Sequence, residues 1–212
     1  MVIVLSSPQS QITLSKVRKI RLEYTSADSI FASQGRAAKA HVTGEAAFAV
    51  LPDGRLFLAL LKGLTRKGDE GFNALVAGSA NFRPWQYEGM VEDWKGVPAS
   101  KVFDLESEVW PAMVTGEIID GNLENVSRVD PENPIVPGTS FRVTSVELQK
   151  TDDSIAAFEL ARLLPCLSEG RGCSTFILNP NYVGTGLLNS HIVDGFPRSE
   201  SDKLPWWKQV TE

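Results

Sequence analysis

The sequence has few of the residues on which small, cross-linked or metal-bound folds depend. Its 212 residues include two cysteines, Cys166 and Cys173, and two histidines, His41 and His191. Two cysteines do not make a disulfide framework, and no Cys-x-x-Cys or His-x-x-x-His pair is present to build a structural zinc site. We therefore expect no metal and no cofactor, and we expect both cysteines to be free thiols in a reducing cytoplasm.

Long apolar runs and an excess of cationic residues are also absent. No apolar run approaches the roughly 20 residues that span a bilayer, and the run at residues 2–5 is too short for the apolar part of a secretory signal. The formal net charge is −5, so there is no surplus of cations to displace counterions from nucleic acid. We expect a cytoplasmic protein with neither a membrane nor a nucleic acid as partner.

The one locally basic stretch, residues 16–21, alternates cationic and apolar side chains. That alternation is typical of a strand with one face in solvent, because successive side chains of a strand point to opposite sides. We therefore expect its lysines and arginines, Lys16, Arg18, Lys19 and Arg21, to be solvated.

The most informative pattern is residues 41–62, where two apolar runs flank a Pro-Asp-Gly tripeptide at residues 52–54. Proline fixes φ at the first corner of a turn, aspartate bonds to its own backbone, and glycine accepts a positive φ. The pattern predicts a β-hairpin. Its runs are apolar at almost every position, whereas a strand with one face in solvent would alternate. We therefore expect the hairpin to be covered on both faces.

The remaining segments predict a fold of the α+β class. Residues 140–150 alternate as a strand does, residues 120–138 are dense in Asn, Asp and Pro and predict a long surface loop, and residues 151–164 combine capping side chains with an apolar face before Pro165. We predict a single domain over residues 1–212 that is mainly antiparallel β-sheet. A partly closed barrel is one arrangement that fits this pattern. One substantial helix is expected at about 151–164.

The C-terminal third holds the densest set of reactive side chains. Cys173 could act as a nucleophile with His191 as its base, and Asp194 or Asn189 could orient the imidazole. This set indicates a thiol-dependent hydrolase or transferase. The alternative interpretation is that Cys173 is a small buried residue at the start of a strand and that His191 belongs to a loop.

A second set of residues could line a pocket for a small molecule. His41 and Glu45 lie four residues apart, so on a strand their side chains face the same side and could also do acid–base chemistry. The apolar and aromatic residues assigned to this pocket are Phe48, Phe57, Trp85, Tyr87 and Trp94. The alternatives are a strand end that meets solvent and aromatic residues that fasten a long loop to the core.

The leading functional prediction is binding of a small, largely apolar molecule in a pocket on the sheet or barrel. The first alternative is the thiol-dependent enzyme described above. The second is a structural or interaction module that self-associates into a homo-oligomer through an edge strand or through the adjacent pair Trp206 and Trp207.

Overall fold

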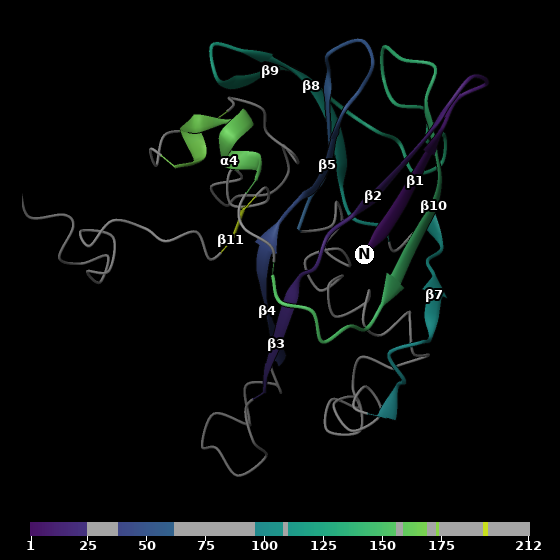
Figure 1. Cartoon of the computed structure of the whole chain (residues 1–212), viewed down its shortest axis with the longest axis vertical. Coiled ribbons are helices and arrows are strands. Elements are labelled where there is room, and N and C mark those ends of the chain that lie inside the picture. Colours follow the sequence, from purple (N-terminus) through teal and green to yellow (C-terminus); the bar gives the residue numbers. More distant parts are fainter. Residues whose placement is uncertain are drawn as a thin grey trace, which may run out of the picture.

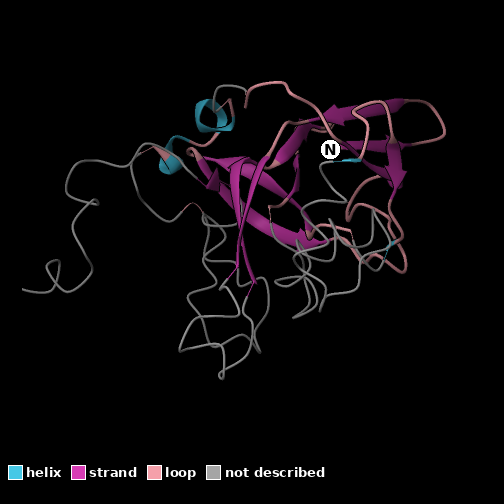
Figure 2. Ribbon diagram, turned by 90° about the horizontal axis from the view of Figure 1, so that it is seen from below, coloured by secondary structure: helices cyan, strands magenta, loops and turns pink. Residues whose placement is uncertain are grey.

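The computed structural model describes residues 1–24, 38–61, 96–107, 110–155, 159–168, 173 and 193–194, and it describes the side chains of these residues outside 20–42 and 193–194. Strands dominate this part of the chain, as Figures 1 and 2 show. Every pairing between the described strands is antiparallel, so the predicted antiparallel character of the fold is confirmed.

Two four-stranded sheets form the body of the molecule. The strands of the first sheet, in spatial order, are β2 (Gln11–Ser15), β1 (Val2–Ser6), β10 (Arg142–Gln149) and β7 (Val102–Asp104). Those of the second are β5 (Ala47–Val50), β6 (Leu56–Ala59), β8 (Met113–Ile119) and β9 (Asn122–Arg128). A smaller sheet contains β11 (Val193–Asp194), β4 (Ala38–Glu45) and β3 (Lys19–Tyr24). The described strands thus form three sheets and no closed barrel.

The second sheet has an apolar core on each of its faces. Cluster 1 lies between the two four-stranded sheets, because its buried side chains include Ile3 and Val146 of the first sheet and Phe57 of the second. Cluster 2 covers the opposite face, where Leu58 meets Leu160 of the helical segment. The second sheet is therefore a middle layer, and its strands can be apolar on both sides.

The predicted hairpin is confirmed between β5 and β6, which pair with Val50 opposite Leu56. Gly54 has a φ of 85°, and its N–H donates to the carbonyl of Leu51 over 2.9 Å. Alternate residues from β6 onward enter the two cores: Phe57, Ala59 and Leu61 join cluster 1, and Leu56, Leu58 and Leu60 join cluster 2. This two-sided burial explains the unbroken apolar run. Residues 41–45 belong instead to β4, which pairs with β3 and β11.

The prediction of one substantial helix at about 151–164 is wrong in length. The α-helix α4 spans Leu160–Leu163, and residues 151–155 are not helical. The Thr151 hydroxyl donates to Asp153 Oδ2 over 2.7 Å and accepts the Asp153 N–H over 3.1 Å, so these side chains form a local turn instead of capping a helix. Pro165 does end the α-helix and opens the 3₁₀ helix η3 (Pro165–Leu167). No helix in the described part of the chain is long and apolar enough to cross a membrane.

The predicted long loop at 120–138 is also corrected, because β9 occupies part of it. Asp120 and Gly121 have φ values of 50° and 75°, and Ile119 faces Asn122 across the turn. An Asp-Gly pair with two positive φ angles is typical of a two-residue hairpin turn. The dense Asn and Asp content thus marks a tight turn and a polar strand at the edge of a sheet, and only the residues after β9 form a loop.

Candidate functional site

A cleft lies at the end of the first sheet where β1 begins. β1 has β2 on one side and β10 on the other. On the β2 side, Met1 and Lys16 exchange backbone hydrogen bonds of 3.0 Å in both directions. On the β10 side, Val2 faces Glu147. Both neighbouring segments continue past Met1, and the chain after β10 runs toward β3 and β4 (Figure 1). The residues that line the cleft belong to these two segments and to Met1.

The cleft has a volume of about 510 Å³, which lies in the range of small-molecule sites. Residues 17–19 form one wall, residues 148–155 without Asp152 form the other, and Met1 lies between them. The apolar residues of the lining are Met1, Val17, Leu148 and Ile155. Its charged residues are the cations Arg18, Lys19 and Lys150 and one carboxylate, Asp153. A mixed lining of this kind suits a molecule with an apolar body and a polar end.

The guanidinium of Arg18 is the unusual group of the lining. Its Nη2 donates to the Ala59 carbonyl over 2.7 Å. Its Nε and Nη1 atoms are buried and have no hydrogen-bond partner among the described residues, and no described carboxylate forms an ion pair with it. Burial lowers the pKa of Arg18 from its ordinary value to about 10, so the group stays charged at neutral pH. A buried cation with unused donors is unfavourable unless something accepts from it.

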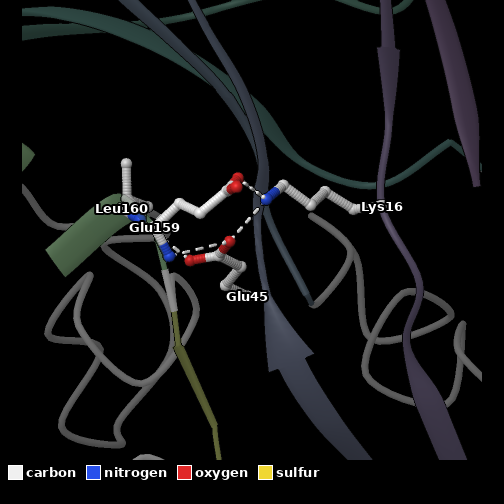
Figure 3. Close-up of polar contacts among 4 residues, drawn as sticks. All are labelled: Lys16, Glu45, Glu159 and Leu160. Carbon is white, nitrogen blue, oxygen red and sulfur yellow. Dashed lines mark hydrogen bonds and ion pairs between the residues drawn. The ribbon is translucent and has the colours of Figure 1, made fainter. Parts of the chain in front are cut away.

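The expectation that the basic stretch at residues 16–21 is solvated is wrong for Arg18 and for Lys16. Lys16 belongs to a polar cluster with Glu45 and Glu159, which Figure 3 shows in close-up. Its ammonium group lies 2.6 Å from Glu45 Oε1 and 2.5 Å from Glu159 Oε2, and 5.0 Å from the centre of the Phe48 ring. The Glu45 carboxylate also accepts the backbone N–H of Glu159 over 3.3 Å and that of Leu160 over 3.0 Å.

This cluster has a structural role because it joins three segments of the chain. Glu45, which is 2% exposed, satisfies N–H groups at the start of α4 and balances the charge of Lys16. Burial lowers the pKa of Lys16, but its hydrogen bonds to Glu159 and Glu45 and their charges outweigh burial and raise it. The hydrogen bond and charge of Lys16 lower the pKa of Glu159. The cluster fixes Lys16, the residue next to Val17 of the cleft wall.

The residues predicted for a ligand pocket do not come together at this cleft. Phe57 lies wholly inside cluster 1, and Phe48 packs against cluster 2. Both oxygens of Glu45 are engaged in the polar cluster, whose members are not among the residues that line the cleft. His41 stands opposite Arg21 in the β3–β4 pairing, and its side chain is outside the described part. Trp85, Tyr87 and Trp94 lie outside the described residues, as do Trp206 and Trp207.

The prediction of free thiols is wrong, because Cys166 and Cys173 form a disulfide. The bridge lies against the β8–β9 hairpin: Leu123 donates its N–H to the Cys173 carbonyl over 2.8 Å. In this state the sulfur of Cys173 is not available as a thiolate. Of the other two residues assigned to catalysis, His191 is outside the described residues. Asp194 of β11 faces Gly44 of β4, and its side chain is not described. Their catalytic role stays a prediction.

Comparison with known proteins finds no family model that matches the chain and no similar curated protein or solved structure. The function must therefore be argued from the cleft itself. Sequence reasoning missed the cleft because its two walls are far apart in the chain and meet only through the pairing of β1 with β2 and β10. The local signal at Arg18, a cation within an alternating stretch, is the same for a solvated and a buried side chain.

Proposed function

We propose that the protein binds a small, largely apolar molecule in the cleft between residues 17–19 and 148–155. The observation that carries the proposal is the cleft of about 510 Å³, whose lining combines apolar residues with a few charged ones. Met1 and Leu148 contribute buried apolar surface, while Lys19 and Gln149 are exposed. Apolar contact supplies affinity and a few polar groups fix orientation in sites of this kind.

The location of the cleft supports the same proposal. It lies at the end of a sheet in which β1 is paired on both sides, and backbone hydrogen bonds hold the start of each wall, next to Lys16 and at Leu148. The Lys16–Glu45–Glu159 cluster holds the start of one wall in place. A preformed cleft costs a ligand little ordering of the protein, which favours binding.

A neutral fluorescent probe tests this proposal. N-phenyl-1-naphthylamine is a small apolar molecule whose emission rises in apolar surroundings, and we expect it to bind the protein with one saturable site. Ser154 is exposed on the cleft wall, so Ser154→Trp should fill part of the space and weaken binding of the probe. Ser140 is exposed outside the cleft, and Ser140→Trp is the matched control. Equal binding by both variants would contradict the proposal.

The Cys166–Cys173 disulfide affects the expected compartment and the first alternative function. Disulfides persist in oxidising compartments and are rare in the cytoplasm, so the Cys166–Cys173 bridge favours an oxidising compartment over the cytoplasmic location predicted from the sequence. The thiol-dependent enzyme would require this bridge to be reduced. A homo-oligomer stays a prediction, and native mass spectrometry of the purified protein would test it.

A further inference from the structure

We propose that the molecule bound in the cleft carries an anionic group, such as a carboxylate or a sulfonate, and that Arg18 receives it. This inference rests on the proposed function, because it names the chemical class of the ligand of the same cleft. Arg18 lines the cleft, and its Nε and Nη1 donors have no partner among the described residues.

The first support is the hydrogen-bond inventory of the guanidinium. Arginine carries five N–H donors and no acceptor. One bond, from Nη2 to the Ala59 carbonyl, anchors the group. That bond holds the planar fork in one orientation, so little side-chain freedom is lost when an oxyanion arrives. An oxyanion accepts from adjacent guanidinium N–H groups with high geometric specificity, and such charge-assisted bonds are among the strongest that proteins form.

The second support is that the nearby carboxylates are used elsewhere. Glu45 accepts from Lys16 and from the Leu160 N–H, and Glu159 pairs with Lys16. Asp153, the carboxylate of the cleft wall, accepts the hydroxyl hydrogen of Thr151 over 2.7 Å. The described part of the chain therefore supplies no counter-ion to Arg18, and a bound anion would supply one.

The third support is the charge of the cleft relative to the rest of the protein. The whole chain carries a formal net charge of −5, whereas three cationic side chains and one carboxylate line the cleft. Cations gathered at a cleft attract anionic ligands and raise their local concentration. The apolar residues Val17, Leu148 and Ile155 then favour an organic anion with an apolar body over a bare inorganic anion.

A matched pair of probes tests the inference. N-phenyl-1-naphthylamine and 1-anilinonaphthalene-8-sulfonate share one aromatic scaffold, and the second adds a sulfonate. We would measure both dissociation constants at fixed ionic strength for the wild-type protein, for Arg18→Met and for Arg128→Met. Arg128 is exposed on β9, so its variant removes the same charge away from the cleft. The ratio of the two dissociation constants in each protein isolates the contribution of the sulfonate.

We expect Arg18→Met to reduce the preference for the sulfonate about tenfold or more, since a lost charge-assisted hydrogen bond is worth about 1.5–3 kcal/mol and 1.4 kcal/mol is a factor of ten. Arg128→Met should leave the ratio unchanged. If Arg18→Met fails to fold, Arg18→Gln replaces it and should lower the same ratio.

Two results would overturn the inference in distinguishable ways. If both probes bind but their ratio is the same in all variants, Arg18 does not receive an anion and the proposed function stands. If neither probe binds, or if Ser154→Trp leaves both affinities unchanged, the cleft is not a binding site, and the proposed function fails together with the inference.

Discussion

Replacing Arg18 by methionine should leave the ligand-free protein at least as stable as the wild type. The guanidinium is buried, and the lowering of its pKa to about 10 corresponds to roughly 3 kcal/mol against the charged form. Methionine keeps much of the apolar stem and removes that penalty. The loss of the bond from Nη2 to the Ala59 carbonyl costs about 1.5–3 kcal/mol in the opposite direction.

The balance of these terms predicts a gain of between zero and about 2 kcal/mol in the free energy of unfolding of Arg18→Met, in line with the effect of replacing buried charges by apolar residues. Urea denaturation followed by circular dichroism would measure it, with the slope of the transition checked for a change in the unfolded state. Arg128→Met, a change on an exposed strand position, should stay within about 0.5 kcal/mol. A loss of more than about 2 kcal/mol in Arg18→Met would refute the reasoning, because the guanidinium would then have partners that stabilise the fold.

Three further predictions concern the stability of the fold. Glu45→Ala removes one partner of Lys16 and the acceptor for the N–H groups at the start of α4. It should lower the free energy of unfolding by about 3–5 kcal/mol in chemical denaturation. Glu132→Ala on the surface should have little effect. Phe57→Ala opens a cavity in cluster 1 and should cost about 3–5 kcal/mol; a loss below about 1 kcal/mol would mean that this face is exposed. Reduction of the Cys166–Cys173 bridge should lower the free energy of unfolding by about 2–3 kcal/mol. The intact mass measured without reductant should be lower than the mass of the reduced protein by two hydrogens, and equal masses would show free thiols.

The hairpin and the strand at residues 140–150 were predictable because burial pattern and turn chemistry agree there. The run around Phe57 is apolar on both faces because two cores cover the sheet, and the Pro-Asp-Gly turn fixes its end. In β10, Val143 and Val146 are both buried although they lie three positions apart, because the pairing with β1 shifts register between Val4 and Leu5. The break in alternation at Ser145 is the sequence signal of that shift.

The helix at 151–164 and the solvated basic stretch were mispredicted because long-range contacts decide both. The capping side chains of Thr151 and Asp153 bond to each other in a turn, and the helix start at Leu160 is capped from a distant strand by Glu45. Arg18 alternates with apolar neighbours as a solvated residue would, yet its guanidinium reaches the Ala59 carbonyl. The local sequence predicts neither contact, since each depends on how separate segments of the chain pack.

The cleft and the disulfide could not be predicted for a related reason. The cleft walls are brought together only by the order β2-β1-β10 in the first sheet, and no motif marks them. A pair of cysteines separated by seven positions is compatible with two thiols or with one bridge, and only the packing of the segment on the β8–β9 hairpin places both sulfurs together.

Mapping of backbone amide chemical shifts during a titration with 1-anilinonaphthalene-8-sulfonate would show whether the cleft beside Met1 binds an organic anion. We expect the largest saturable shifts on residues 17–19 and 148–155, on both walls of the cleft and on either side of Met1. We expect no such shifts of these residues in Ser154→Trp. Shifts confined to other surfaces, or the absence of saturable shifts on these two segments, would contradict the claim that this cleft is the binding site.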